Sequence, residues 1–264
     1  MLPIIASVIL SPDFLYPIFF LIALLYAMAG FGGGSSYLAI LALTALPTGE
    51  LRVMALVCNI IVAGGGVYHF ARAGAIPWRR ALPLVLCSVP AAYLGGRIHL
   101  PREYFLGLLG VVLLLAGLAM WWRKNAANQV LTEVPPEKPT KTFLLAAGLG
   151  GGLGFLAGVV SIGGGIFLSP FLFLKRWAAA RAIAAVTSLF IFVNSLAGLA
   201  GQFSTAVEVD WQLLGWLALM VFIGGQLGTR LTIRKLSPTA IRRIAAVLIV
   251  AVGLRLLAQV AGML

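Results

Sequence analysis

Two stretches decide how this chain folds, Met28-Ala29-Gly30-Phe31-Gly32-Gly33-Gly34-Ser35-Ser36 and Val160-Ser161-Ile162-Gly163-Gly164-Gly165-Ile166. Each places consecutive glycines inside a long apolar run. An interior glycine costs a helix about 1 kcal/mol relative to alanine, and the backbone groups that a break releases inside a membrane are tolerated only beside protein or water. A broken helix in each half of a hydrophobic chain therefore indicates the binding site of a transporter.

Glycine triplets also have a plainer use, as notches at which two helices pack closely. Gly64-Gly65-Gly66 and Gly150-Gly151-Gly152 occur in this chain as well, so a triplet by itself is weak evidence. The paired position of the first two triplets, early in each half of the chain, favours the functional interpretation over the packing one.

The composition indicates an integral membrane protein. Of the 264 residues, 61% are hydrophobic and only 10% are charged, whereas about 25% of a soluble domain is charged. The net charge of +12 does not indicate a nucleic-acid partner, because the basic residues lie in short loops between apolar segments. Basic residues in that position orient a multi-pass protein in its membrane.

The remaining signals argue against an enzyme. The first 25 residues have no basic region or cleavage motif, so we expect a retained helix and not a signal peptide. Cys58 and Cys87 lie in apolar segments without metal or redox spacing. The sequence also contains no phosphate-binding loop and no nucleophile–base pair, and we expect no catalytic residue, cofactor or metal.

The apolar segments predict an all-α, polytopic protein built from two repeats. Residues 13–46 and 143–174 are each too long for one span of about 20 residues, and each is broken at its glycine triplet. Three ordinary spans follow each broken run. They cover about 51–70, 78–97 and 104–122, and then about 180–201, 211–231 and 239–260. The predicted units are a first transmembrane repeat, a cytoplasmic linker and a second transmembrane repeat, over residues 1–123, 124–141 and 142–264.

The loop charges predict that the two repeats are inverted. If each broken run were a single span, the basic loops at 175–181 and 230–243 would lie outside, against the positive-inside rule. If each broken run is a hairpin that returns to its own side, these loops and those at 72–80 and 123–141 are all cytoplasmic. A hairpin plus three spans then inverts the second repeat and places both chain ends in the periplasm.

The breaks themselves predict an anion site. The second piece of each broken helix begins just after its glycines, and a helix start offers free N–H groups and partial positive charge. Glycine also lets a small ligand approach the backbone closely. The predicted substrate-binding residues of the two stretches are Gly32, Gly33, Gly34, Ser35, Ser36, Ser161, Gly163, Gly164 and Gly165.

The ordinary spans add five polar candidates, which are Asn59, His69, Thr187, Ser188 and Asn194. A Ser or Thr in such a helix more often bonds its own backbone, whereas an asparagine is costlier in lipid and so a stronger candidate. His69 lies near a helix end, where an interfacial role is as well supported as a substrate role. All seven carboxylates fall in loops or at helix ends, which favours an anionic substrate over a cation.

The residues of the two breaks resemble the TauE/SafE family of membrane permeases. The resemblance rests on AGFGGGSS and VSIGGGIFLSP, and on Ala184-Ala185-Val186-Thr187-Ser188-Leu189. It implies export of sulfite or organosulfonates from a bacterial cell through the inner membrane, by a multi-pass protein. The first half departs from the second, because Val57-Cys58-Asn59 stands where the second half has Thr187-Ser188.

The function predicted is a secondary transporter that exports small sulfur-containing anions such as sulfite or sulfonates. Its partners would be the anion and the lipid bilayer, with no nucleic acid and with a homo-oligomer possible. One alternative is an uptake permease for a related anion or organic acid. Another is a non-transporting scaffold whose glycines only pack helices, and a membrane-embedded enzyme has the least support.

Overall fold

The fold is all-α, as the sequence predicts. The computed structural model describes residues 12–28, 32–122, 139–175, 177–231 and 238–262, and this part of the chain contains helices and no strands. The first five helices are α2 (Pro12–Met28), α3 (Gly34–Ala42), α4 (Thr48–Arg72), α5 (Trp78–Arg97) and α6 (Arg102–Trp122). The next five are α7 (Pro139–Val160), α8 (Gly165–Leu174), α9 (Ala180–Phe203), α10 (Trp211–Leu231) and α11 (Pro238–Val260).

The helices have the lengths that a membrane requires. Four of them in the described part, α4, α6, α9 and α10, contain windows long and apolar enough to cross a bilayer. Both long apolar runs are broken where the glycines predict, and their second pieces, α3 and α8, have only 9 and 10 residues. At 1.5 Å per residue, each is roughly 15 Å long, about half of a hydrocarbon core of about 30 Å.

Two parts of the sequence interpretation lie outside the described residues. These are Ala29, Gly30 and Phe31 of the first stretch, and residues 124–138 of the predicted linker. The last residues assigned to that linker, 139–141, already belong to α7.

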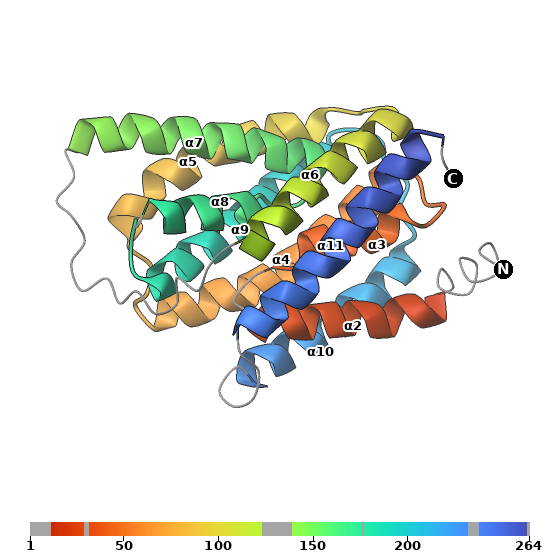
Figure 1. The fold of residues 1–264 in the computed structure, drawn as a ribbon, viewed down its shortest axis with the longest axis horizontal. Helices are drawn as coiled ribbons and strands as arrows, with labels where there is room; N and C mark the ends of the chain where they lie inside the picture. Colours follow the sequence, from red (N-terminus) through yellow and green to blue (C-terminus); the bar gives the residue numbers. More distant parts are fainter. Residues whose placement is uncertain (1–11, 29–31, 123–138, 176, 232–237, 263–264) are drawn as a thin grey trace.

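The long helices pack in pairs with defined directions. In Figure 1, α2 lies beside α10 along one side of the molecule, and α5 lies beside α7 along the opposite side. Residue numbers rise together along both pairs, so these helices are parallel. In contrast, α4 with α9 and α6 with α11 are antiparallel. The parallel directions follow from Leu84–Gly150 and Ala92–Gly158 for α5 with α7, and from Phe20–Gly224 and Leu24–Gly228 for α2 with α10. The antiparallel directions follow from Leu56–Gly198 and Gly66–Ser188 for α4 with α9, and from Gly110–Leu257 and Gly117–Val250 for α6 with α11.

The pairing has an internal regularity. Exchanging α2–α6 for α7–α11, in order, turns the α2–α10 contact into the α7–α5 contact and the α3–α4 contact into the α8–α9 contact. The α4–α9 and α6–α11 contacts map onto themselves. Glycines permit the closest of these approaches, since Gly150 and Gly158 face backbone carbonyls of α5. The packing interpretation therefore does apply to Gly150.

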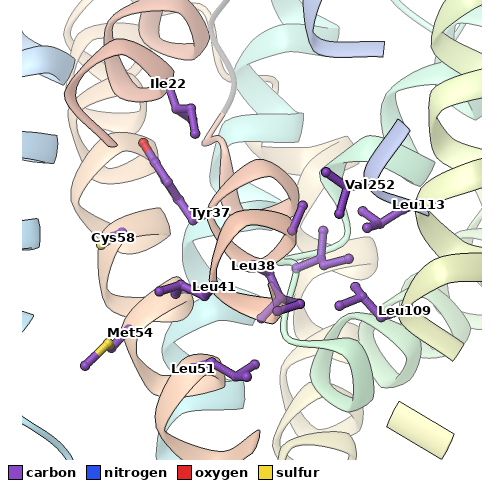
Figure 2. Packing of buried hydrophobic residues seen from close by; sticks show 14 of the residues in the cluster. Ile22, Tyr37, Leu38, Leu41, Leu51, Met54, Cys58, Leu109, Leu113 and Val252 are labelled. Carbon is purple, nitrogen blue, oxygen red and sulfur yellow. The ribbon is translucent and has the colours of Figure 1, made fainter. Parts of the chain in front are cut away.

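The short helix α3 is enclosed by protein. Figure 2 shows Tyr37 on the side of α3 that faces Cys58, and Leu38 on the other side, toward Leu109 of α6 and Val252 of α11. Tyr37 and Leu38 are both fully buried. Helix ends inside a membrane are tolerated only where protein or water surrounds them, and α3 meets that condition.

Candidate functional site

Both short helices begin at a glycine in the left-handed conformation. Gly33 caps α3 with φ 94°, and Gly164 caps α8 with φ 75°, next to Gly163 with φ 80°. Residues with a side chain rarely adopt these angles, and glycine adopts them without steric cost. These three glycines are therefore required by the turns and are more than packing notches.

The first glycine motif (residues 32–34) and the second (residues 163–165) meet at the crossing of α4 and α9. A Cβ atom added to Gly32 would contact both Asn59 of α4 and Ile191 of α9, and one added to Gly163 would contact the same two side chains. Asn59 and Ile191 thus lie between the motifs. Two stretches far apart in the sequence form one candidate site.

Asn59 connects the two motifs by hydrogen bonds. Its Oδ1 accepts from the Gly34 N–H at 3.0 Å, and so satisfies one of the free donors at the start of α3. Its Nδ2 donates to the Ile162 carbonyl at 3.3 Å and to Ser195 Oγ at 2.8 Å. The side chain is completely buried. The amide therefore acts as an internal ligand of the first half-helix and as a link to the second.

The start of α8 has no such internal ligand. Ile191 and Thr187 are the side chains nearest to Gly165 there. The N–H groups further along the first turn bond back to the Gly164 carbonyl, but those of Gly165 and Ile166 find no acceptor within the described residues. The start of α8 thus presents two free donors and the positive end of a helix dipole.

Two buried polar side chains of α9 lack a hydrogen-bond partner, and one of them, Thr187, lies beside Gly165. Thr187 and Asn194 are seven residues apart, hence on one face, and they are 0% and 1% exposed. Thr187 Oγ1 and both polar atoms of the Asn194 amide lack a hydrogen-bond partner. An unpaired buried polar group costs about 1–3 kcal/mol. In native structures such groups usually find a partner in water, an ion or a ligand. This arrangement can therefore bind a small hydrogen-bond acceptor.

The serines predicted for the site are all buried, in different surroundings. Ser35 and Ser36 form the first turn of α3, where Ser36 Oγ shares a 2.7 Å hydrogen bond with Tyr26 of α2. Ser188 packs on the other side of α9, against Gly66 of α4. Ser161 lies two residues before the second motif and has a positive φ of 59°. The structure places Ser35, Ser36 and Ser161 at the helix breaks and Ser188 at a helix–helix contact.

His69 does not join this group. It is exposed near the end of α4 and stacks edge-on against Tyr68, with 5.7 Å between the ring centroids. Ten residues separate it from Asn59 on the same helix, which corresponds to roughly 15 Å along the axis.

Sequence reasoning left out two residues that the structure brings to the motifs. Ser195 accepts a hydrogen bond from Asn59. Arg52, the second residue of the span predicted at about 51–70, is 1% exposed and donates from Nε to Ser161 Oγ at 2.8 Å. A lone arginine close behind the start of an apolar helix is the one signal that could have indicated it, since a charge there needs a partner.

A multi-pass chain whose core holds two glycine-broken helices is typical of a membrane transporter. This chain belongs to the sulfite exporter TauE/SafE family, whose model matches residues 15–256. It is 32% identical over 239 residues to the probable membrane transporter protein y4hK of Sinorhizobium fredii, covering 90% of this chain and 95% of that protein. It is 24% identical over 249 residues to the probable membrane transporter protein ORF9 of a Sinorhizobium species, covering 93% and 92%. No solved structure matches the chain.

Proposed function

We propose that this membrane transporter exports small sulfur-containing anions, such as sulfite or a sulfonate, across the bacterial inner membrane, and that the anion binds at the start of α8. One observation carries the proposal. Two half-helices begin at left-handed glycines and converge on one crossing, and the second presents N–H groups without an internal acceptor. The family description, a sulfite exporter, supports the class of substrate.

The chemistry of the site suits an oxyanion. Sulfite and sulfonate oxygens are hydrogen-bond acceptors, and they would meet the N–H groups of Gly165 and Ile166 where the helix dipole favours negative charge. Thr187 and Asn194 offer further donors from α9. Glycine at both 163 and 164 permits the left-handed turn from which these N–H groups start.

The same geometry suits alternating access by two opposed hairpins. We propose that α2–α3 and α7–α8 enter the membrane from opposite sides. The half-membrane length of α3 and α8 supports this. The α4–α9 and α6–α11 pairs support it too, because each joins equivalent helices of the two halves and each is antiparallel. A reporter fused to the C-terminus should then report a periplasmic position, and a cytoplasmic one would contradict the inverted arrangement.

Flux measurements in proteoliposomes test the transport function. Moving one negative charge outward across an interior-negative membrane gains about 2.3 kcal/mol per 100 mV, so export needs no coupling ion. We expect radiolabelled sulfite to leave protein-containing vesicles faster when a valinomycin-set potential is interior-negative than when it is zero. Empty vesicles are the control. Absence of flux would favour a scaffold, and accumulation of an anion against its gradient would favour uptake.

A further inference from the structure

We propose that Arg52 supplies the fixed positive charge that selects anions by their charge number, and that Ser161 couples this charge to the second glycine motif. The inference rests on the proposed anion transport and adds a specificity residue to it. Arg52 lies on α4 seven residues before Asn59, hence on the same face and roughly 10 Å along the axis. Its guanidinium is buried, with only 1% of the side chain exposed.

The guanidinium is held at the ends of two helices. Nη1 donates to the Ile98 carbonyl at 2.8 Å, just beyond the end of α5, and Nη2 donates to the Gly158 carbonyl at 3.0 Å, near the end of α7. The face of the Phe105 ring lies 5.6 Å from the guanidinium carbon. The C-terminal ends of helices carry partial negative charge, so these partners solvate the cation and fix its position.

These partners do not neutralise the charge. In the part of the chain that the structure describes, no carboxylate forms an ion pair with Arg52. The nearest carboxylate in sequence, Glu50, is itself buried and accepts the Asp210 N–H at 2.8 Å. A buried charge is costly unless it is paired. An anionic substrate nearby is the counter-charge that this part of the protein otherwise lacks.

Ser161 connects the charge to the turn that starts α8. Its Oγ accepts from Arg52 Nε at 2.8 Å and donates to the Gly158 carbonyl at 3.3 Å. It does so from a left-handed conformation two residues before Gly163, a conformation that costs a residue with a side chain free energy. In the first stretch the corresponding position is Gly30, which has no hydroxyl. Within the described residues, the hydroxyl bonded to this buried cation thus lies just before the second motif.

Charge selectivity gives a readout that a merely structural arginine would not change. The test compares sulfite, at an alkaline pH where it is a dianion, with methanesulfonate, a monoanion of similar chemistry. We expect Arg52→Gln to raise KM by about tenfold for each unit of substrate charge, the size that Coulomb's law gives at roughly 10 Å and an effective dielectric constant of about 20. The preference for the dianion should thus fall by about tenfold.

Two control variants separate charge from shape. Arg52→Lys keeps the charge and should keep the preference for the dianion even if the maximal rate falls. Arg102→Gln removes an arginine that donates to the carbonyls of Leu46 and Thr44 at the end of α3, away from the second motif. It should leave the preference unchanged. A similar loss of preference in both glutamine variants would overturn the inference.

A matched pair at Ser161 keeps the test decisive if Arg52→Gln does not fold. Asp and Asn have the same shape and both tolerate the left-handed conformation. Ser161→Asp should pair with Arg52 and abolish the preference for the dianion, whereas Ser161→Asn should retain it. Equal preference in these two variants refutes the role of the charge. If the wild-type protein transports neither anion, the proposed function itself fails, and that outcome is distinct.

Discussion

The starts of α3 and α8 are alike in backbone and different in chemistry. Each begins at a left-handed glycine followed by a second glycine, and each lies against a long crossing helix by way of its side chains. At α3 one such side chain is Asn59, whose amide oxygen accepts the Gly34 N–H. At α8 the nearest side chains are Ile191 and Thr187, and the Gly165 N–H has no acceptor within the described residues. The protein thus satisfies one of the first two N–H groups of α3 and neither of the first two of α8.

The difference indicates that the two breaks have different tasks. A donor that already has an internal acceptor gains little from a substrate, because one hydrogen bond only replaces another. We propose that the start of α3 is a structural joint between the two motifs, and that the start of α8 is the binding end. Two halves with the same fold can therefore differ in chemistry. Four sets of variants test this division of roles between the starts of α3 and α8.

Leucine at the second motif should have the largest effect. In Gly164→Leu the Cβ atom would lie 3.0 Å from both Ala157 and Phe190, at a φ of 75°. The left-handed conformation alone costs a side-chain residue about 1–2 kcal/mol. We expect sulfite flux in proteoliposomes to fall to the level of empty vesicles while the protein still inserts. Gly33→Leu, at φ 94° and against the Tyr37 ring, should have a similar effect on flux.

Gly74→Leu is the matched control for both variants. Gly74 also has a positive φ, of 61°, but a Cβ atom there would meet nothing within 4 Å. The strain is comparable and the site is untouched, so flux should be close to that of the wild type. Normal flux in Gly164→Leu would mean that the second motif is only a packing notch.

Ile191→Asn makes the second half resemble the first. The new amide would lie beside Gly165 and could accept the free N–H, as Asn59 does for Gly34. We expect the melting temperature to be retained and the flux to fall by about tenfold or more, because one charge-assisted hydrogen bond to the anion, about 1.5–3 kcal/mol, would be lost. Ile191→Val is the control. Unchanged flux in Ile191→Asn would place the binding end elsewhere.

The two buried asparagines should respond in opposite ways. Asn59→Leu breaks hydrogen bonds to Gly34, Ile162 and Ser195, and each group left unpaired costs about 1–3 kcal/mol. Its melting temperature should therefore fall. Asn194→Leu breaks none, since neither polar atom of Asn194 has a partner. We expect it to be at least as stable as the wild type but to bind the anion more weakly, seen as a raised KM.

If Asn194→Leu melts lower than Asn59→Leu, the assignment of structural and binding roles is reversed. Thermal unfolding of the two purified variants, measured side by side in the same detergent, makes this comparison directly.

Local patterns predicted the elements of the fold better than their contacts. The bounds of α5 and α10 agree residue for residue with the predicted spans 78–97 and 211–231, because hydropathy and flanking residues are properties of the segment itself. The breaks at both motifs follow from glycine in the same local way. The contact between Asn59 and Ser195 depends on how α4 crosses α9, and no spacing within one helix specifies that crossing.

The search for polar residues also could not find Ile191. Its importance lies in being apolar beside Gly165, whereas Asn59 places an amide beside Gly34, and only the crossing of α4 and α9 brings these side chains to the motifs. Arg52 was missed for a related reason. Its place near the start of a span is compatible with a solvated end, and it is the packing of α5 and α7 around it that buries the charge.

His69→Ala should have the smallest effect, and it tests whether the transport is coupled to protons. His69 is exposed, contacts Tyr68, and lies roughly 15 Å along α4 from Asn59. An imidazole can carry a proton, but a coupling residue has to contact either the substrate or the moving element. We therefore expect flux to follow a valinomycin-set potential, to ignore an imposed pH gradient, and to be unchanged in His69→Ala.

His99→Ala is the matched control, since His99 is the other of the two histidines and pairs with Thr205 at 3.0 Å. Flux that follows the pH gradient, ignores the potential and loses that dependence only in His69→Ala would make His69 the coupling residue. The binding end would then have to extend along α4 to the end of that helix, and the division between the starts of α3 and α8 would no longer account for transport.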